Sequence, residues 1–153
     1  MLKLEIRLAS IAIFSLALGV ILYALFRPAG STALLPSSSD YFYNLPAACA
    51  QAAYGQAPAF IHTFGFTLLT VSALGVGRRS LALSVELWLL IGFAFEFLQH
   101  PSATPYLLNI GLSETHVILD YAVGTFDVSD LFAMICGGGA ATALVKRLSR
   151  ETC

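Results

Sequence analysis

Four long apolar stretches are the feature that most restricts what this chain can fold into. They cover approximately residues 8–26, 57–76, 81–99 and 128–145. A helix that crosses a bilayer needs about 20 mostly apolar residues, and each stretch meets that length. In the whole chain 58% of the residues are hydrophobic and 11% are charged, whereas an ordinary soluble domain is about 25% charged. The sequence therefore predicts an all-α integral membrane protein, a four-helix bundle that forms a single domain over 1–153.

The basic residues predict how this bundle is oriented. Only Arg27 lies in the two long loops, 27–56 and 100–126, and the other Lys and Arg residues flank the predicted spans on the opposite side. Basic residues are enriched in cytoplasmic loops, so we expect both termini in the cytoplasm and both long loops outside. The flanking basic residues are Lys3, Arg7, Arg78, Arg79, Lys146, Arg147 and Arg150.

Net charge and cysteine usage exclude several function classes. A net charge of −1 gives no basic footprint for nucleic acid, so no nucleic-acid partner is expected. The three cysteines fall in different places: Cys49 in an outer loop, Cys136 within the fourth span and Cys153 on the cytoplasmic side. None of them has metal-ligand spacing with another. No HExxH motif is present either. The sequence therefore predicts no disulfide framework, no metal site and no cofactor, with a divalent cation held by the carboxylates as the alternative left open.

Five polar side chains fall at one predicted depth. His62 lies in the second span, Glu96 and Gln99 end the third, and Asp127 and Asp130 open the fourth. The members of each pair are three residues apart, so they share a helix face. At a rise of 1.5 Å per residue, all five lie within about one to two turns of the outer boundary. An ionisable side chain inside a bilayer costs about 2.5–3.5 kcal/mol on insertion scales, so we predict that these residues form a shared ligand-binding site.

Each of these residues also has a structural interpretation. Asp127 can cap the fourth helix, with Asp130 favoured by the helix dipole in its first turn. Glu96 can accept a hydrogen bond from His62 and join two helices, and Gln99 can simply lie in the interface. Small residues allow close helix packing, and they form a face on the fourth span at Gly137, Gly138 and Gly139, with Gly75, Gly77 and Gly92 as further candidates.

Three short motifs carry most of the predicted site in a fixed order. They are FIHTFGF at 60–66, EFLQ at 96–99 and GTFDVSDL at 124–131. In these motifs, and in their spacing over roughly 57–145, the chain resembles the VanZ-like family of small bacterial membrane proteins. The family takes its name from a glycopeptide (teicoplanin) resistance protein. The resemblance implies a multi-pass protein of the bacterial inner (cytoplasmic) membrane with a role in the cell envelope, and it does not imply a reaction.

The chain departs from the family pattern at two positions. Family members often carry an Arg where this chain has Gly124, and an Asn where it has Met134. The predicted site is therefore less polar and more acidic than the usual version. This departure argues against any function that requires the Arg.

Several classes of function fit these residues. The first is a binding or accessory protein that holds an outer-leaflet lipid headgroup or an amine-bearing, glycopeptide-like ligand. Three carboxylates repel a phosphate, so an anionic lipid would need a bridging divalent cation, for which carboxylates are suitable ligands, whereas a cationic ligand needs no bridge. The alternative is an enzyme that uses the His and the carboxylates for acid/base or metal-assisted chemistry on a lipid-linked substrate.

Two further classes have weaker support from the sequence. A proton-coupled transporter would need Glu86 to extend a path inward, about 15 Å from Glu96 along the helix axis. A structural subunit would use the polar cluster for helix packing alone. The sequence leaves open the ligand and the oligomeric state, including whether the chain forms an oligomer.

Overall fold

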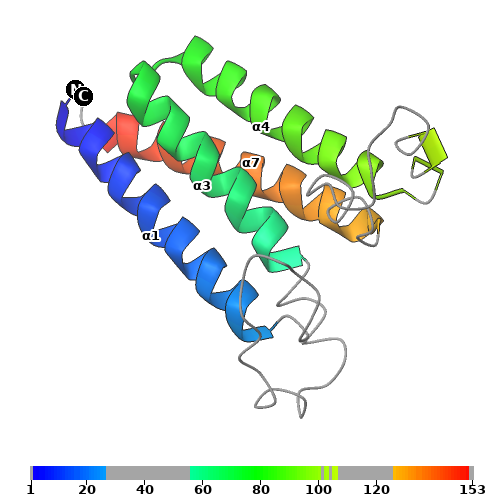
Figure 1. The fold of residues 1–153 in the computed structure, drawn as a ribbon. Helices are drawn as coiled ribbons and strands as arrows, with labels where there is room; N and C mark the ends of the chain where they lie inside the picture. Colours follow the sequence, from blue (N-terminus) through cyan, green and yellow to red (C-terminus); the bar gives the residue numbers. More distant parts are fainter. Residues whose placement is uncertain (1, 27–55, 101, 104, 107–125, 152–153) are drawn as a thin grey trace.

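A computed structural model of the chain consists of long helices arranged side by side (Figure 1). The structure describes residues 2–26, 56–100, 102–103, 105–106 and 126–151, and these contain no strand. Its long helices are α1 (Leu2–Phe26), α3 (Ala57–Leu74), α4 (Arg78–Leu98) and α7 (Val128–Glu151). All four are long and apolar enough to cross a membrane, which confirms the predicted all-α chain with four candidate spans.

Most residues of the two predicted long loops are outside the part of the chain that the structure describes. Residues 27–55 and 107–125 are outside the described part of the chain. The prediction of two long outer loops therefore stays a prediction. The positions of Arg27, Cys49 and Gly124 fall in the same undescribed segments, and Cys153 is also outside the described residues.

Helices α1 and α7 extend beyond the apolar stretches that predicted them. Helix α1 begins at Leu2 instead of residue 8, and α7 continues to Glu151 instead of ending at 145. Hydropathy marks the part of a helix that suits lipid, whereas Lys, Arg, Leu and Glu keep the backbone helical beyond it. Glu151 also pairs with Arg147 one turn earlier at 3.4 Å and with Arg7 of α1 at 3.6 Å. The pair of Arg7 with Glu151 joins the start of α1 to the end of α7.

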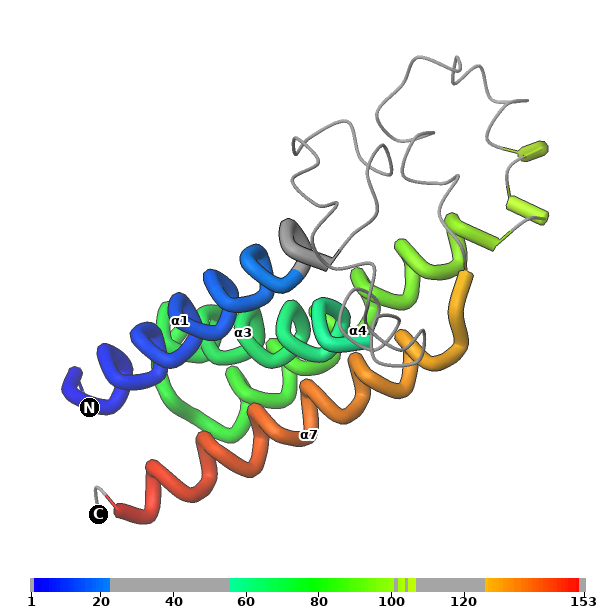
Figure 2. The backbone as a smooth tube through the Cα atoms, turned by 90° about the horizontal axis from the view of Figure 1, so that it is seen from below, coloured from blue at the N-terminus to red at the C-terminus, as the bar shows by residue number. Residues whose placement is uncertain are grey.

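Helix α3 is the central helix of the bundle. It packs against α1, α7 and α4, and α4 also packs against α7. The start of α1, the end of α7 and the turn between α3 and α4 lie at one end of the bundle (Figures 1 and 2). We call this the basic end, because the described Lys and Arg residues lie there and are exposed. The acidic end is the opposite one, where α4 ends and α7 begins.

A glycine turn reverses the chain between α3 and α4. Gly75 has a φ of 87°, a backbone conformation that favours glycine, and α3 ends there. The Ser80 hydroxyl accepts a hydrogen bond from the N–H of Gly77 at 3.0 Å and donates one to the carbonyl of Gly75 at 2.6 Å. Gly75 and Gly77 therefore form a turn, instead of the helix-packing face considered for them from the sequence. In Figure 1, α3 and α4 diverge from this turn toward the acidic end.

The small-residue face of α7 packs as predicted at two of its three glycines. A Cβ atom on Gly137 would collide with the carbonyl oxygen of Phe60 in α3, and one on Gly138 would lie 3.2 Å from Val85 of α4. The predicted close packing of α7 is therefore confirmed for Gly137 and Gly138. Gly139 is exposed instead, and no described atom lies within 4 Å of the position that its Cβ would take.

Glycine also permits close approach at the other helix contacts. A Cβ on Gly65 of α3 would lie 2.7 Å from Cγ of Leu16 in α1, and one on Gly92 of α4 would lie 2.6 Å from Sδ of Met134 in α7. Small residues at helix contacts are typical of bundles in lipid, where close packing replaces the hydrophobic effect. The Met134 side chain thus fills the space beside Gly92, one turn below the acidic end.

Candidate functional site

Glu96 occupies the last turn of α4 and is buried there. Only 6% of its surface is exposed. Its Oε2 atom accepts a hydrogen bond from the backbone N–H of Asp127 at 3.4 Å. Because Asp127 directly precedes α7, this bond links the end of α4 to the start of α7.

Asp127 caps the helix that follows it. Its Oδ1 accepts a hydrogen bond from the N–H of Ser129 at 2.8 Å, and its carbonyl accepts one from the N–H of Asp130 at 3.0 Å. These are the bonds that an N-cap aspartate makes. The structural interpretation of Asp127 as the cap of the fourth helix is therefore confirmed.

Asp130 adds a third carboxylate beside these two, in the first turn of α7. Its Oδ1 atom is buried, and no hydrogen-bond partner is found for it in the described part of the chain. When ionised, the carboxylates of Asp127 and Asp130 lie near enough to repel that of Glu96 and each other. We call Glu96, Asp127 and Asp130 the acidic site. A buried carboxylate oxygen without a donor is costly, so, as far as the described residues go, this site is short of positive charge and of hydrogen-bond donors.

Gln99 lies at the edge of the acidic site. It is the C-cap residue of α4, and its backbone N–H reaches the carbonyls of Phe95 and Glu96 at 3.2 and 3.1 Å. It is half-buried and shares a helix face with Glu96, three residues earlier. The described hydrogen bonds of Gln99 are those of its backbone, and its predicted part in a ligand-binding site stays a prediction.

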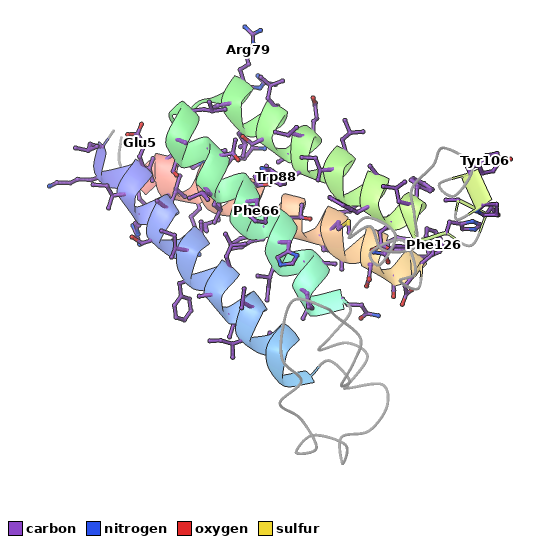
Figure 3. The ribbon with its side chains drawn as sticks, viewed as in Figure 1. Glu5, Phe66, Arg79, Trp88, Tyr106 and Phe126 are labelled. Carbon is purple, nitrogen blue, oxygen red and sulfur yellow. The ribbon has the colours of Figure 1, made fainter. Side chains whose placement is uncertain are left out.

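His62 lies apart from the acidic site. It is exposed, and its ring centroid is 6.0 Å from that of Phe66, one turn along α3. Phe66 in turn stacks on Trp88 of α4, with centroids 4.5 Å apart, and Figure 3 shows these two rings together between the helices. Among the described residues, no hydrogen bond or ion pair joins His62 to a carboxylate. The hydrogen bond from His62 to Glu96 that the structural interpretation proposed is not formed.

Depth along the bundle explains this separation. The stacked rings of Phe66 and Trp88 place these two residues at one level. His62 lies four residues outward from Phe66, about 6 Å, while Glu96 lies eight residues outward from Trp88, about 12 Å. His62 is therefore about one turn deeper than Glu96, and the divergence of α3 and α4 (Figure 1) adds lateral separation.

A hydrogen bond between two spans was missed by the sequence analysis. The indole N–H of Trp88 in α4 donates to the Thr70 hydroxyl in α3 at 2.8 Å. The sequence contains a feature that indicates such a bond, because Trp88 is the sole tryptophan of the chain and a buried indole N–H usually finds an acceptor. Together with Phe66, this bond fixes the middle of α4 against α3.

The acidic site differs from a metal centre in its described geometry. Within residues 2–26, 56–100 and 126–151, no three His, Cys, Asp or Glu side chains converge on a point where they could hold one metal ion. Glu96 instead directs one oxygen at a backbone amide.

The chain was compared with known proteins at the level of family, sequence and structure. No protein-family model, curated protein or solved structure matches it. The function must therefore be argued from the residues of the site.

Proposed function

We propose that this chain is a multi-pass protein of the bacterial cytoplasmic membrane, of VanZ-like type, with a binding or accessory role in the cell envelope. It binds an amine-bearing lipid headgroup, or a similar cationic envelope ligand, at the acidic site. The observation that carries the proposal is Asp130 Oδ1, which is buried without a described donor beside two further carboxylates.

Charge favours a cationic group over a bare phosphate. The acidic site contains three carboxylates, and the described Lys and Arg residues lie at the other end of the bundle. An ammonium group offers three donors and no acceptor, so it can satisfy the Asp130 oxygen and relieve the repulsion among the carboxylates at the same time. A phosphate would add to that repulsion.

The site is held in place before any ligand binds. Asp127 is fixed by capping α7, and Glu96 is held by the amide of Asp127. The contact of Gly92 with Met134 packs α4 against α7 one turn below. Groups that are ordered in advance lose little entropy on binding, which suits a site that recognises a headgroup.

Orientation is part of the same proposal. With the basic end in the cytoplasm, the acidic site faces the outer leaflet and the envelope. An acidic site at headgroup depth in that leaflet meets amine-bearing lipids directly. Amine-bearing glycopeptides also approach a bacterial cell from this side.

The geometry gives less support to an acid/base enzyme. Such a mechanism needs His62 and a carboxylate within reach of the same substrate atoms. His62 lies about one turn deeper than Glu96 and contacts Phe66 instead. Binding therefore has the stronger support among the functions that the sequence suggests.

Native mass spectrometry of the purified full chain tests the proposal. Released from membranes of phosphatidylethanolamine and phosphatidylglycerol, the protein should retain bound phosphatidylethanolamine. Glu96→Gln combined with Asp130→Asn should abolish that retention, whereas Glu86→Gln, which removes an exposed carboxylate elsewhere on α4, should preserve it. Equal retention by all three proteins would refute the proposal, and teicoplanin serves as a second, glycopeptide probe.

A further inference from the structure

The basic end carries more positive charge than its carboxylates neutralise. Glu151 pairs with both Arg7 and Arg147, and Glu5 is the other carboxylate close to this end, beside Gly75. Within the described helices, no ion pair is found for five exposed cations: Lys3, Arg78, Arg79, Lys146 and Arg150.

These unpaired cations come from three helices and lie at one end of the bundle. Lys3 is in the first turn of α1, Arg78 and Arg79 begin α4, and Lys146 and Arg150 lie in the last two turns of α7. In Figure 3 the Arg79 side chain extends away from the helices. Each position adjoins an apolar span, so the charges stand at the depth of lipid headgroups, which long Lys and Arg side chains reach easily.

We infer that the basic end is a binding surface for anionic phospholipid headgroups of the leaflet that surrounds it. Arg pairs with phosphate through two parallel hydrogen bonds, and Lys provides a point charge. Clusters of four to eight Lys and Arg beside a span attract anionic lipids by about 1 kcal/mol for each cation. This inference stands apart from the proposed function, because it uses the opposite end of the bundle and holds whichever side that end faces.

Position favours lipid over other anionic partners. An acidic protein would have to displace headgroups that already surround the span ends. Arg7 and Arg147 are already paired with Glu151, Arg7 across from α1 and Arg147 within α7. The surface is therefore formed by the five unpaired cations.

Electron spin resonance with spin-labelled lipids measures which lipid the protein surface holds. In vesicles of phosphatidylcholine, the full chain should hold phosphatidylglycerol several-fold more strongly than phosphatidylcholine, and about 1 kcal/mol for one cation corresponds to roughly fivefold. The preference should weaken at high salt. Arg78→Gln with Arg79→Gln should reduce it, and Arg78→Lys with Arg79→Lys should retain it. Equal binding of the two lipids by the unaltered chain would overturn the inference.

A matched pair of variants on α7 tests the role of ion pairing. Arg150→Gln and Arg147→Gln each remove one positive charge from the last turns of the helix, but Arg147 is paired with Glu151. Arg150→Gln should lower the phosphatidylglycerol preference clearly, and Arg147→Gln should lower it less. Equal losses would mean that net charge, not a surface of unpaired cations, selects the lipid.

Discussion

The side chain of Glu96 accepts a hydrogen bond from the backbone N–H of Asp127, 31 residues later in the chain, at 3.4 Å. The distance is long for an N–H···O bond, which is most often about 2.9–3.0 Å. The contact therefore acts as a weak tether between the end of α4 and the start of α7. Its acceptor is also one of the carboxylates proposed to bind ligand.

Removing this acceptor should loosen the start of α7 locally. Glu96→Ala leaves the Asp127 amide without its partner, so hydrogen exchange at that amide should speed up. Glu96→Gln keeps a carbonyl oxygen in place, and its exchange rate should stay close to that of the unaltered protein. Exchange measured by NMR in micelles separates the two variants. Protection of the amide in Glu96→Ala would contradict the tether.

The capping role of Asp127 predicts a stability loss that depends on the replacement. Asp127→Ala removes the acceptor for the Ser129 amide and should lower the free energy of unfolding by about 1 kcal/mol. Asp127→Asn retains a capping oxygen and should cost only a small part of that. Chemical unfolding in detergent, followed by circular dichroism, measures both. Equal losses would show that the negative charge of Asp127, not its cap, stabilises α7.

The glycines of α7 predict effects of opposite sign from the same substitution. Gly137→Ala places a methyl group against the backbone of Phe60, and overpacking of this kind costs about 1–3 kcal/mol. Gly139→Ala fills exposed space and should stabilise α7 by about 0.5–1 kcal/mol, because glycine is a poor helix former. Thermal unfolding measures the stability of both variants relative to the unaltered protein. Destabilisation by both substitutions would contradict this packing.

A buried hydroxyl in α3 predicts a stabilising variant. Thr67 is fully buried, and its Oγ1 has no hydrogen-bond partner among the described residues. Thr67→Val removes an unsatisfied group and should stabilise the protein by about 1 kcal/mol. Thr63 is the control, because its hydroxyl donates to the carbonyl of Ala59 at 3.2 Å, so Thr63→Val should bring no gain. A lower unfolding temperature for Thr67→Val would show that the hydroxyl has a partner.

The sequence predicted the helices well because apolar length is a strong signal. It missed the ends of α1 and α7, since helix propensity and the ion pairs of Glu151 continue the helices past their apolar parts. Close packing at Gly137 was also predictable, because small residues recur there. The exposure of Gly139 depends on how α7 is rotated about its axis, which composition does not determine.

The candidate site was predictable in part, because positions near helix ends can be read from the apolar stretches. Glu96 and Asp130 were expected together, because each lies in the terminal turn of a helix at the same end of the bundle. His62 was expected with them from its depth alone. Its separation follows from the relative level of α3 and α4, which the stacking of Phe66 on Trp88 reports, and from the divergence of the two helices. Neither property can be derived from spacing along one chain.

The proposed function requires that an amine-bearing headgroup contact Glu96 and Asp130. Carbon-13 NMR of the side-chain carboxyl groups tests this contact, with short-chain phosphatidylethanolamine titrated into bicelles that contain the protein. We expect saturable shifts of the Glu96 and Asp130 carboxyl resonances with phosphatidylethanolamine, no such shift for Glu151 with this lipid, and no shift of Glu96 or Asp130 with phosphatidylglycerol. Unmoved Glu96 and Asp130 resonances, or the same shifts with both lipids, would contradict it.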